Sequence, residues 1–392
     1  MNRRGQLDVA VVGGGVVGAA CALALDSLGL DVALVEGREP ARWSARSEDL
    51  RVYAMAPDSV ALLERIGVWA PVRAARAHAY RRMRVWDAAS GGELAFDADT
   101  LGRAQLGWIV EHALLQDRLW TALAAAGVRL HCPVRVQSLE QDKSAARLRL
   151  DDGTRLEARL VIAADGADSS VRSLAGPEVS AHDYAQRGVV AYVETALAHA
   201  DTAWQRFLPT GPLAFLPFVE GRSSIVWTLP NHEAERVLAV DDAALGRELT
   251  HASQGRLGEV RVASARAAFP LRRQLAHRYV SGRVLLAGDA AHVVHPLAGQ
   301  GVNMGLRDVA ALHASIADAQ SRRVPWDGPH RLARWARGRR SENAAAAYAF
   351  DGINRVFSND RMHASLLRGP LLGLAGRVPG LANLLWRKAS GL

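Results

Sequence analysis

The sequence predicts an α/β protein in which a Rossmann-like nucleotide-binding domain carries an inserted β-sheet domain and ends in a helical C-terminal region. Three observations predict this fold. Residues 7–36 follow the order strand, glycine turn, helix, strand, with which a Rossmann fold begins. Residues 183–275 are rich in strand-like runs that prolines interrupt, and the chain from Asn303 onward is mostly helical in pattern.

The N-terminal unit gives the clearest pattern. Leu7–Val12 is a short apolar run of strand type, and Val16–Leu28 is a helical stretch that ends at Gly29. Asp31–Glu36 returns to the β-branched pattern of a buried strand. The turn between the first strand and the helix is Gly-Gly-Gly-Val-Val-Gly, residues 13–18, which is a G-x-G-x-x-G motif in its full structural context.

Each position of this turn has a physical role in binding a dinucleotide. Gly13 permits the tight turn, Gly15 lets the backbone approach a pyrophosphate, and Gly18 allows close packing of helix on strand. The helix N-terminus around Val17 offers unpaired N–H groups to phosphates. Glu36 ends the second strand, where an acid accepts a hydrogen bond from a ribose hydroxyl. NAD and FAD both use this fingerprint, so the motif alone leaves the dinucleotide open.

Later segments alternate between helical and strand-like patterns. Helices are expected at Pro57–Gly67 and Glu111–Ala126. Short strands are expected at Val134–Leu139, Ala146–Leu150, Thr154–Ala158, Leu160–Ala164, Val189–Glu194, Ala203–Leu208, Ser223–Leu229 and Arg283–Gly288.

Composition narrows the functional classes. The formal charge is +8, but it comes almost entirely from arginines scattered along the chain, since Lys143 and Lys388 are the only lysines. No basic stretch interleaved with aromatic residues accompanies the charge, so nucleic-acid binding is not expected. Cys21 and Cys132 are far apart, which indicates neither a disulfide nor a metal site. No apolar run reaches about eighteen residues, so we expect a cytoplasmic protein.

A second motif follows the strand expected at Arg283–Gly288. Gly288-Asp289 ends that strand, and a loop of small residues, including Gly299 and Gly301, leads to a helix from about Asn303. A carboxylate at a strand end can accept hydrogen bonds from sugar-like hydroxyls. Backbone N–H groups of such a loop can approach a flat polar ring. Without further information, this is a ligand loop for an unnamed ligand.

Together the two motifs resemble the FAD-dependent aromatic hydroxylases of the p-hydroxybenzoate hydroxylase type. The resemblance implies that the cofactor is FAD and that Asp289, next to Gly288, binds its ribityl chain. It also implies a set of loop residues beside the flavin ring: Pro296, Gly299, Gln300, Gly301, Val302 and Asn303. Pro296, Gly299 and Gln300 would form the environment in which the chemistry takes place, with no obligatory acid or base.

Three further positions enter through the same resemblance. Asp165, in the Ala164–Arg172 segment ADGADSSVR, matches a motif linked to FAD and to reduced nicotinamide, although a simple strand-end turn also uses Asp-Gly. Arg51 matches a flavin-contacting arginine, with an ordinary surface arginine as the alternative. His112 stands where an asparagine-like residue is expected near the flavin. His292 and His295 flank the flavin loop and are expected to be structural, with their hydrogen bonds satisfied.

Longer segments narrow the resemblance to the ubiquinone-biosynthesis hydroxylases, which act on polyprenylated phenols and quinols. These segments are HPLAGQGVNMGLRD, LGWIVEHALLQDRL and QRFLPTGPLAFLPF. The family chemistry implies that NAD(P)H reduces FAD, that O2 forms a flavin C4a-hydroperoxide, and that this species hydroxylates the substrate ring. Because the sequence has one dinucleotide fingerprint, NAD(P)H is expected to bind transiently.

The resemblance divides the chain into six segments. FAD-binding segments are expected at 1–70, 106–182 and 276–320, substrate-domain segments at 71–105 and 183–275, and a helical region at 321–392. In the last region, leucines interleaved with arginines between Leu366 and Lys388 fit peripheral contact with the inner membrane, packing onto the domain, or docking of a biosynthetic partner.

Two other functions remain open. One is hydroxylation of a small soluble aromatic acid, although Phe207, Phe215 and Phe218 favour an apolar pocket. The other is a flavin-binding assembly component without turnover. The ring position, the choice between NADH and NADPH, and the oligomeric state are not determined by these motifs.

Overall fold

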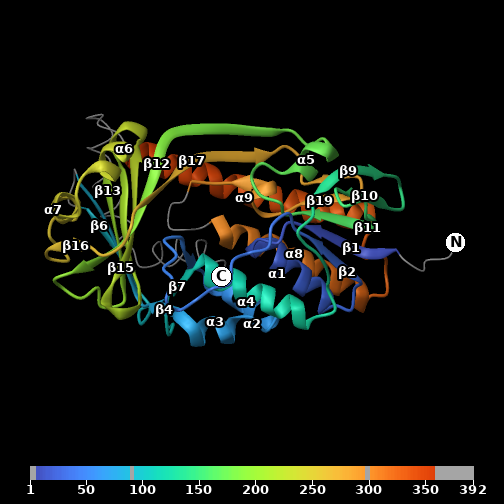
Figure 1. Cartoon of the computed structure of the whole chain (residues 1–392), viewed down its shortest axis with the longest axis horizontal. Helices are drawn as coiled ribbons and strands as arrows, with labels where there is room; N and C mark the ends of the chain where they lie inside the picture. The colour runs from blue at the N-terminus through green and yellow to red at the C-terminus, as the bar shows by residue number, and fades with distance from the viewer. Residues whose placement is uncertain (1–5, 89–91, 296–300, 358–392) are drawn as a thin grey trace.

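The computed structural model describes residues 6–88, 92–295 and 301–357, with side chains to residue 353. The flavin-loop residues Pro296, Gly299 and Gln300, and the leucine-rich tail from Leu366, lie outside the described residues. Figure 1 shows an elongated molecule with a Rossmann part at one end and a large sheet at the other, joined by the long strands β12 and β17 and by helix α9.

The Rossmann part is built on a sheet that contains five parallel strands. β1 lies between β11 and β2, and β8 and β19 extend the parallel set on either side. Antiparallel β18, β10 and β9 complete this sheet. The strands are β1 (Leu7–Val12), β2 (Val32–Val35), β8 (Arg129–His131), β9 (Val136–Gln141), β10 (Ala146–Leu150), β11 (Arg155–Ala163), β18 (Val280–Ser281) and β19 (Val284–Leu286).

The second large sheet has the order β20-β17-β12-β15-β14-β13-β5-β6, with β16 on β12. Its strands are β5 (Arg82–Asp87), β6 (Glu93–Asp97), β12 (Val179–Thr195), β13 (Thr202–Leu208), β14 (Gly211–Pro217), β15 (Ser223–Pro230), β16 (Val260–Val262), β17 (Ala267–Ala276) and β20 (His292–Val293). A small sheet beneath it consists of β3 (Val52–Met55), β7 (Gly107–Glu111) and β4 (Ala77–Tyr80).

Helices cover both parts. The bounds are α1 (Val16–Asp26), α2 (Pro57–Arg65), α3 (Trp69–Arg76), α4 (His112–Ala125), α5 (Ser170–Ala175), α6 (Asn231–Ala239), α7 (Asp242–Ala252), α8 (Gly301–Ser321) and α9 (Pro329–Phe357). Short 3-10 turns occur at Val219–Gly221 and Gly288–Ala290. Among the described residues, no helix has the length and apolar character needed to cross a membrane.

The main core lies in the Rossmann part, because β1 and α1 are buried on nearly every side. All of β1 except Asp8 is buried, and α1 buries Val16 and an unbroken run from Gly18 to Leu25. Burial on both faces explains why these segments are apolar without a clear alternation. Cys21 lies in this run, and burial raises the pKa of its thiol to about 12, so it is an inert core residue.

The prediction of two strands at Thr154–Ala158 and Leu160–Ala164 was wrong. The structure has one strand, β11, that passes through Arg159 without a break. The guanidinium of Arg159 makes ion pairs of 3.0 Å with Asp8 and 2.7 Å with Asp327. A polar residue inside an apolar run therefore marked a partly buried ion-pair site and not a turn.

The inserted region also differs from the sequence prediction. β12 begins at Val179, ten residues earlier than expected, and α6 and α7 interrupt the strands. These helices cover the outer face of the sheet, where Leu245 and Leu249 of α7 join the same apolar cluster as the strand residues. With one face covered by helices, the other face of this sheet is directed toward the Rossmann part.

Candidate active site

The glycine turn after β1 has the geometry that its motif requires. Gly13 has φ +107°, and a Cβ there would lie 2.3 Å from the carbonyl oxygen of Ala164. A Cβ on Gly18 would lie 1.9 Å from the carbonyl oxygen of Gly13, whereas one on Gly15 would meet nothing within 4 Å. Gly13 and Gly18 are therefore required by the packing of the chain itself, and Gly15 keeps space open for a ligand.

Glu36 lies beside this turn, as expected from its position at the end of β2. Its carboxylate accepts hydrogen bonds from the backbone N–H groups of Gly14, at 2.5 Å, and Arg38, at 2.9 Å. Trp120 of α4 donates to the carbonyl of Gly14 at 2.7 Å. Glu36 and Trp120 thus hold the glycine turn from two sides and so fix the position at which α1 begins.

The Gly288-Asp289 motif lies next to the glycine turn of residues 13–18, because Gly288 packs closely against Val17. A Cβ on Gly288 would lie 3.1 Å from Val17, and one on Gly305 of α8 would lie 2.5 Å from it. Gly288 also has φ +57°. These two glycines let three segments distant in sequence converge, and Asp289 is left exposed beside the α1 N-terminus.

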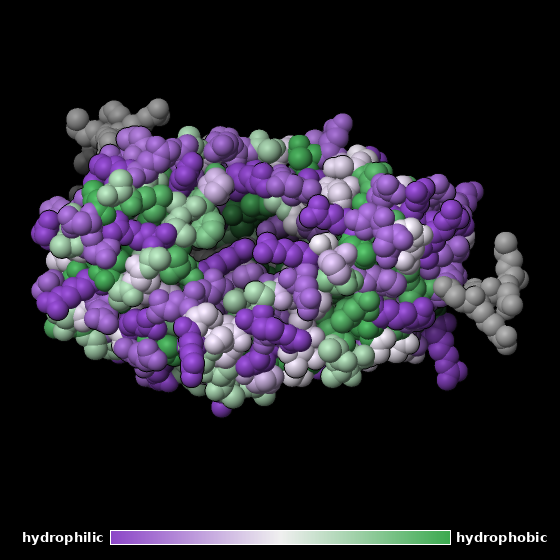
Figure 2. Space-filling model, viewed as in Figure 1, coloured by the Kyte–Doolittle hydropathy of each residue, from purple (hydrophilic) through white to green (hydrophobic). Residues whose placement is uncertain are grey.

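A cavity of about 510 Å³ separates the Rossmann part from the large sheet. Figure 2 shows the molecule hollowed between its two halves, with apolar residues deep in the hollow. Motif residues on its wall are Gly15, Val17, Arg51, His112, Asp289, Gly301 and Val302. The opposite wall is the inner face of the sheet, which includes Gly188, Val190, Ala214, Leu216, Val226, Thr228, Phe269 and Leu271. The two predicted functional regions therefore face one another.

The alternation of strand residues explains which side chains reach the cavity. On β12, Gly188 and Val190 face it, whereas Val189 and Ala191 pack beneath α6 and α7. The three phenylalanines expected to favour an apolar pocket do not line this cavity. Phe215 belongs to the core under the helices, Phe207 to a cluster at β5 and β6, and Phe218 to a cluster with Tyr192. The cavity wall is apolar, but other residues supply it.

Arg51 and His112 are neighbours on the cavity wall. The hydroxyl of Tyr53 and Nδ1 of His112 lie 2.9 Å apart, and the guanidinium of Arg51 lies 5.4 Å from the Tyr53 ring centre. Burial and the adjacent Arg51 lower the pKa of His112 to about 4. The imidazole is therefore neutral at physiological pH, so that it offers hydrogen bonds but no charge.

Asp165 and Asn303 use their side chains within the protein. The Asp165 carboxylate accepts hydrogen bonds from the Ser169 hydroxyl, from the Ser170 hydroxyl at 3.2 Å and from the Val171 N–H at 3.1 Å, which caps α5. This is the strand-end role that the sequence left as an alternative. Asn303 donates to the carbonyl of Ala54 at 2.8 Å and accepts from the N–H of Ala56 at 2.9 Å. It thereby holds the junction of β3 and α2 against α8.

The two histidines of the flavin motif have different surroundings. Nε2 of His292 lies 2.6 Å from the Asp308 carboxylate, which also accepts from Gly288, Arg339 and Asn343. No motif in the sequence indicated this acidic partner, because Asp308 lies 16 residues further along the chain and only the fold of α8 brings it next to His292. The expectation that His295 has satisfied hydrogen bonds was wrong: neither of its ring nitrogens has a partner among the described residues.

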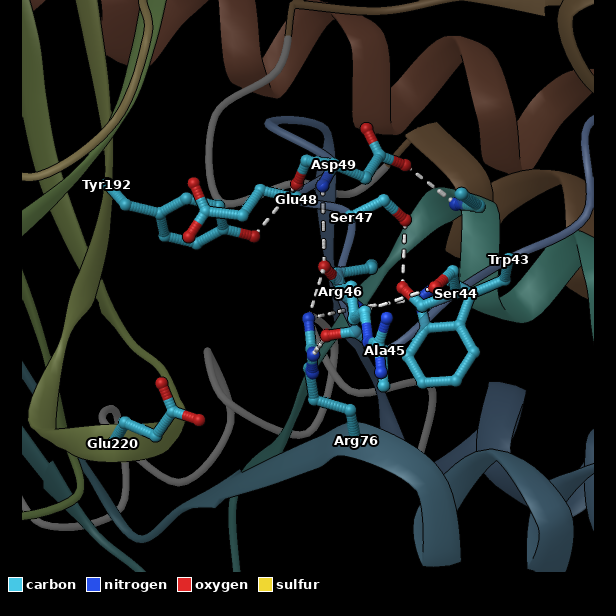
Figure 3. Close-up of polar contacts among 12 residues, drawn as sticks. Trp43, Ser44, Ala45, Arg46, Ser47, Glu48, Asp49, Arg76, Tyr192 and Glu220 are labelled. Atoms are coloured by element: carbon cyan, nitrogen blue, oxygen red, sulfur yellow. Dashed lines mark hydrogen bonds and ion pairs between the residues drawn. The ribbon is translucent and has the colours of Figure 1, made fainter.

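The segment Trp43–Asp49, which no sequence motif indicated, connects the two halves of the molecule (Figure 3). Tyr192 of β12 donates to the carbonyl of Asp49 at 2.8 Å, and Arg222 makes an ion pair with Glu48. On the Rossmann side, the Asp49 carboxylate accepts from the N–H of Ala113 at 2.7 Å. Because Arg51 follows directly, these contacts position it on the cavity wall.

A larger cavity of about 930 Å³ lies in the outer part of the sheet domain, between α7 and β16. None of the predicted cofactor residues is on its wall. The smaller, central cavity is therefore the candidate active site.

Comparison with known proteins agrees with this geometry. The family model described as an FAD binding domain matches residues 6–326. The chain belongs to this FAD-binding family. A 3-demethoxyubiquinol 3-hydroxylase of Escherichia coli is 38% identical over 387 residues, which cover 98% of each chain. The ubiquinone hydroxylase UbiL of Rhodospirillum rubrum is 36% identical, over 98% of this chain and 89% of its own.

Solved structures show the same fold. A p-nitrophenol 4-monooxygenase from Pseudomonas putida superposes with a TM-score of 0.77 at 20% identity, covering 98% of each chain. PqsL, a probable FAD-dependent monooxygenase from Pseudomonas aeruginosa, gives a TM-score of 0.77 at 23% identity over 94% of this chain and 99% of its own. The predicted fold class and the prediction of an FAD-dependent monooxygenase of the FAD-binding family are confirmed.

Proposed function

We propose that this FAD-binding family member hydroxylates the aromatic ring of a polyprenylated phenol or quinol in ubiquinone biosynthesis, using NAD(P)H and O2. The central cavity carries the proposal, because one wall consists of the cofactor motifs and the other is an apolar sheet face. A substrate ring can lie next to the cofactor motifs while an apolar chain follows the strands. The names of the E. coli and R. rubrum relatives support the same substrate class.

The same geometry supports a set of FAD contacts. The pyrophosphate would bind the N-terminus of α1 at Gly15 and Val17. Gly15 has no Cβ, and the space beside it is empty to a distance of 4 Å. Glu36 would reach the ribose hydroxyls and Asp289 the ribityl chain. Bound FAD supplies the activation of oxygen, while the protein holds the cofactor and shields the reaction from water.

Residues near the flavin ring complete the proposed site. The N–H groups at the start of α8, at Gly301 and Val302, would face the ring, where the helix dipole favours negative charge. Arg51, which directly precedes β3, and the neutral His112, which directly follows β7, would also contact the flavin ring. The ring environment proposed for Pro296, Gly299 and Gln300 remains a prediction from the sequence, as does any membrane or partner contact of the tail.

The apolar wall favours a prenylated substrate over a small aromatic acid. An acid would need a cationic clamp, and the described arginines on this cavity wall are Arg51 and Arg272. Arg272 is already bound to Asp168, at 3.0 and 3.1 Å. Arg51 belongs to the proposed flavin contacts. The sheet face instead offers Val190, Leu216 and other aliphatic side chains.

Mass spectrometry of quinone-pathway lipids from a host strain without this gene tests the proposal. We expect one under-hydroxylated prenyl phenol or quinol to accumulate, and the wild-type gene, but not Asp289→Ala, to remove it. Asp152→Ala, at an exposed aspartate of the β10–β11 turn that is not on the cavity wall, serves as the matched control. An unchanged lipid profile in a strain with no second hydroxylase would overturn the proposed substrate class.

A further inference from the structure

His295 is a buried imidazole on the wall of the central cavity with unused hydrogen-bonding capacity. Its residue is 1% exposed, and the cavity wall includes it together with Val294 and Leu271. Among the described residues, neither Nδ1 nor Nε2 has a hydrogen-bond partner. Buried polar atoms are nearly always paired in folded proteins, so an unpaired imidazole beside a ligand cavity indicates a partner that arrives with the ligand.

The chain just before His295 is anchored by strand pairing and by an ion pair. β20 pairs with β17 through Leu275 and Gln274, and the neighbouring His292 is anchored by Asp308. The ring of Tyr184 packs edge-on against the His295 imidazole, with 5.0 Å between ring centres. The imidazole is thus supported by packing on one side and lines the cavity on the other.

The charge state of His295 suits an acceptor. Burial lowers its pKa to about 4, with Asp351 acting in the opposite direction, so the ring is neutral near pH 7 and one of its nitrogens has a free lone pair. Charged and titratable groups on the packed elements are bound elsewhere: Tyr184 and Arg273 to Asp351, Arg272 to Asp168, and Arg307 to Asp58.

We propose that His295 accepts a hydrogen bond from a ring hydroxyl of the aromatic substrate and so sets the orientation of the ring. This inference rests on the proposed function, because a phenol or quinol brings a hydroxyl donor against a sheet face that consists mainly of apolar side chains. Val190, Leu216 and Val226 on that wall cannot orient a ring by direct bonds. A hydrogen bond to this buried acceptor gives the ring a preferred rotation, and it therefore determines which carbon faces the cofactor.

Binding of two matched probes to the FAD-loaded full-length enzyme tests this inference without turnover. One probe is a phenol with a two-isoprene side chain, and the other is its O-methyl ether, which cannot donate a hydrogen bond. Perturbation of the flavin absorbance gives the Kd of each. The wild type should bind the phenol about tenfold more tightly than the ether, and His295→Leu should abolish this difference.

Two additional variants separate a ligand contact from a structural role. His295→Gln retains an acceptor and should keep part of the preference for the phenol. His232→Leu, at an exposed histidine of α6, should leave both dissociation constants unchanged. Because Leu replaces an imidazole whose nitrogens are unpaired, His295→Leu should also leave the FAD content unchanged and raise the Tm of the substrate-free enzyme or leave it unaltered.

The outcomes are distinct. Equal binding of phenol and ether by the wild type, or a preference that persists in His295→Leu, overturns the role of His295 even if the enzyme hydroxylates prenyl phenols. If the wild-type enzyme prefers the phenol but the strain without the gene has an unchanged lipid profile, the proposed function is overturned and the hydrogen bond to His295 is retained. A fall in Tm for His295→Leu with loss of FAD would identify His295 as structural.

Discussion

The Asp308 carboxylate lies 2.6 Å from Nε2 of His292, and both side chains are almost completely buried. The same carboxylate accepts from Nε of Arg339 at 2.8 Å and from the N–H of Gly288 at 3.0 Å. A residue at the middle of α8 therefore connects the Gly288-Asp289 turn with α9. The buried Asp308 carboxylate accepts the hydrogen bond from Gly288 and so holds in place the turn that carries the proposed ribityl contact.

Asp308→Asn should destabilise the protein by about 3 kcal/mol, because the buried Arg339 would lose its buried ionic partner and keep only its ion pair with the exposed Glu342. Urea unfolding followed by far-UV circular dichroism measures this change. Asp318→Asn is the matched control on the same helix, since its ion pairs with Arg322 and Arg331 are partly exposed and should contribute much less to stability. Equal effects of the two substitutions on the unfolding free energy would contradict a special stabilising role of the buried Asp308 carboxylate.

Close packing of Gly305 on Val17 predicts a coupled pair of substitutions. Gly305→Ala places a Cβ 2.5 Å from Val17 and should cost about 1–3 kcal/mol through overpacking. Val17→Ala should relieve most of that cost in the double variant. Gly338→Ala in α9, where a Cβ meets nothing within 4 Å, should instead stabilise by about 0.5–1 kcal/mol. Additive costs in the double variant would argue against direct contact.

Gly15→Val should separate cofactor binding from folding. Position 15 has an ordinary negative φ and open space for a side chain, so the apoprotein should keep its unfolding midpoint. The new side chain would occupy the space proposed for the pyrophosphate, and the Kd for FAD, measured by fluorescence quenching, should rise at least tenfold. Gly13→Val should reduce the stability of the apoprotein itself. Unchanged FAD affinity for Gly15→Val would remove the α1 N-terminus from the site.

Acid should destabilise the protein through His112. Its folded-state pKa of about 4 lies below the ordinary value of 6.5, so the unfolded chain binds the proton more readily. Stability is therefore complete above about pH 6.5 and decreases as the pH falls toward 4. His112→Asn should make the unfolding free energy less dependent on pH between these values. A pH profile identical to that of the wild type would show that His112 does not titrate in this way.

Local motifs could be predicted from the sequence, and distant pairings could not. The glycine turn was predictable because Gly13, Gly15 and Gly18 act within one strand–helix junction. The placement of Arg159 within β11 depends on its ion pairs with Asp8 and Asp327, which are far away along the chain. A single sequence does not reveal such partners, so a partly buried ion-pairing residue was interpreted as a break between strands.

The cavity wall was predictable in character but not in its residues. An apolar sheet was expected, yet the choice of Val190 over Val189, or Leu216 over Phe215, depends on which face of the sheet α6 and α7 cover. Those helices were not predicted. His295 could not be distinguished from His292 either, because only the fold brings Asp308 to one and a cavity to the other.

β12 is a single strand of 17 residues that begins near α5, crosses the cavity wall at Gly188 and Val190, and ends beside β16. Its residues alternate between the helix-covered core and the cavity, so exchanges at Gly188 or Val190 alter the pocket lining without disturbing Val189 or Ala191 beneath α6 and α7. The cofactor turns lie on other strands. Substrate preference in this architecture can thus diverge by a few substitutions of cavity-lining residues, while the turns proposed to bind the cofactor are inherited unchanged.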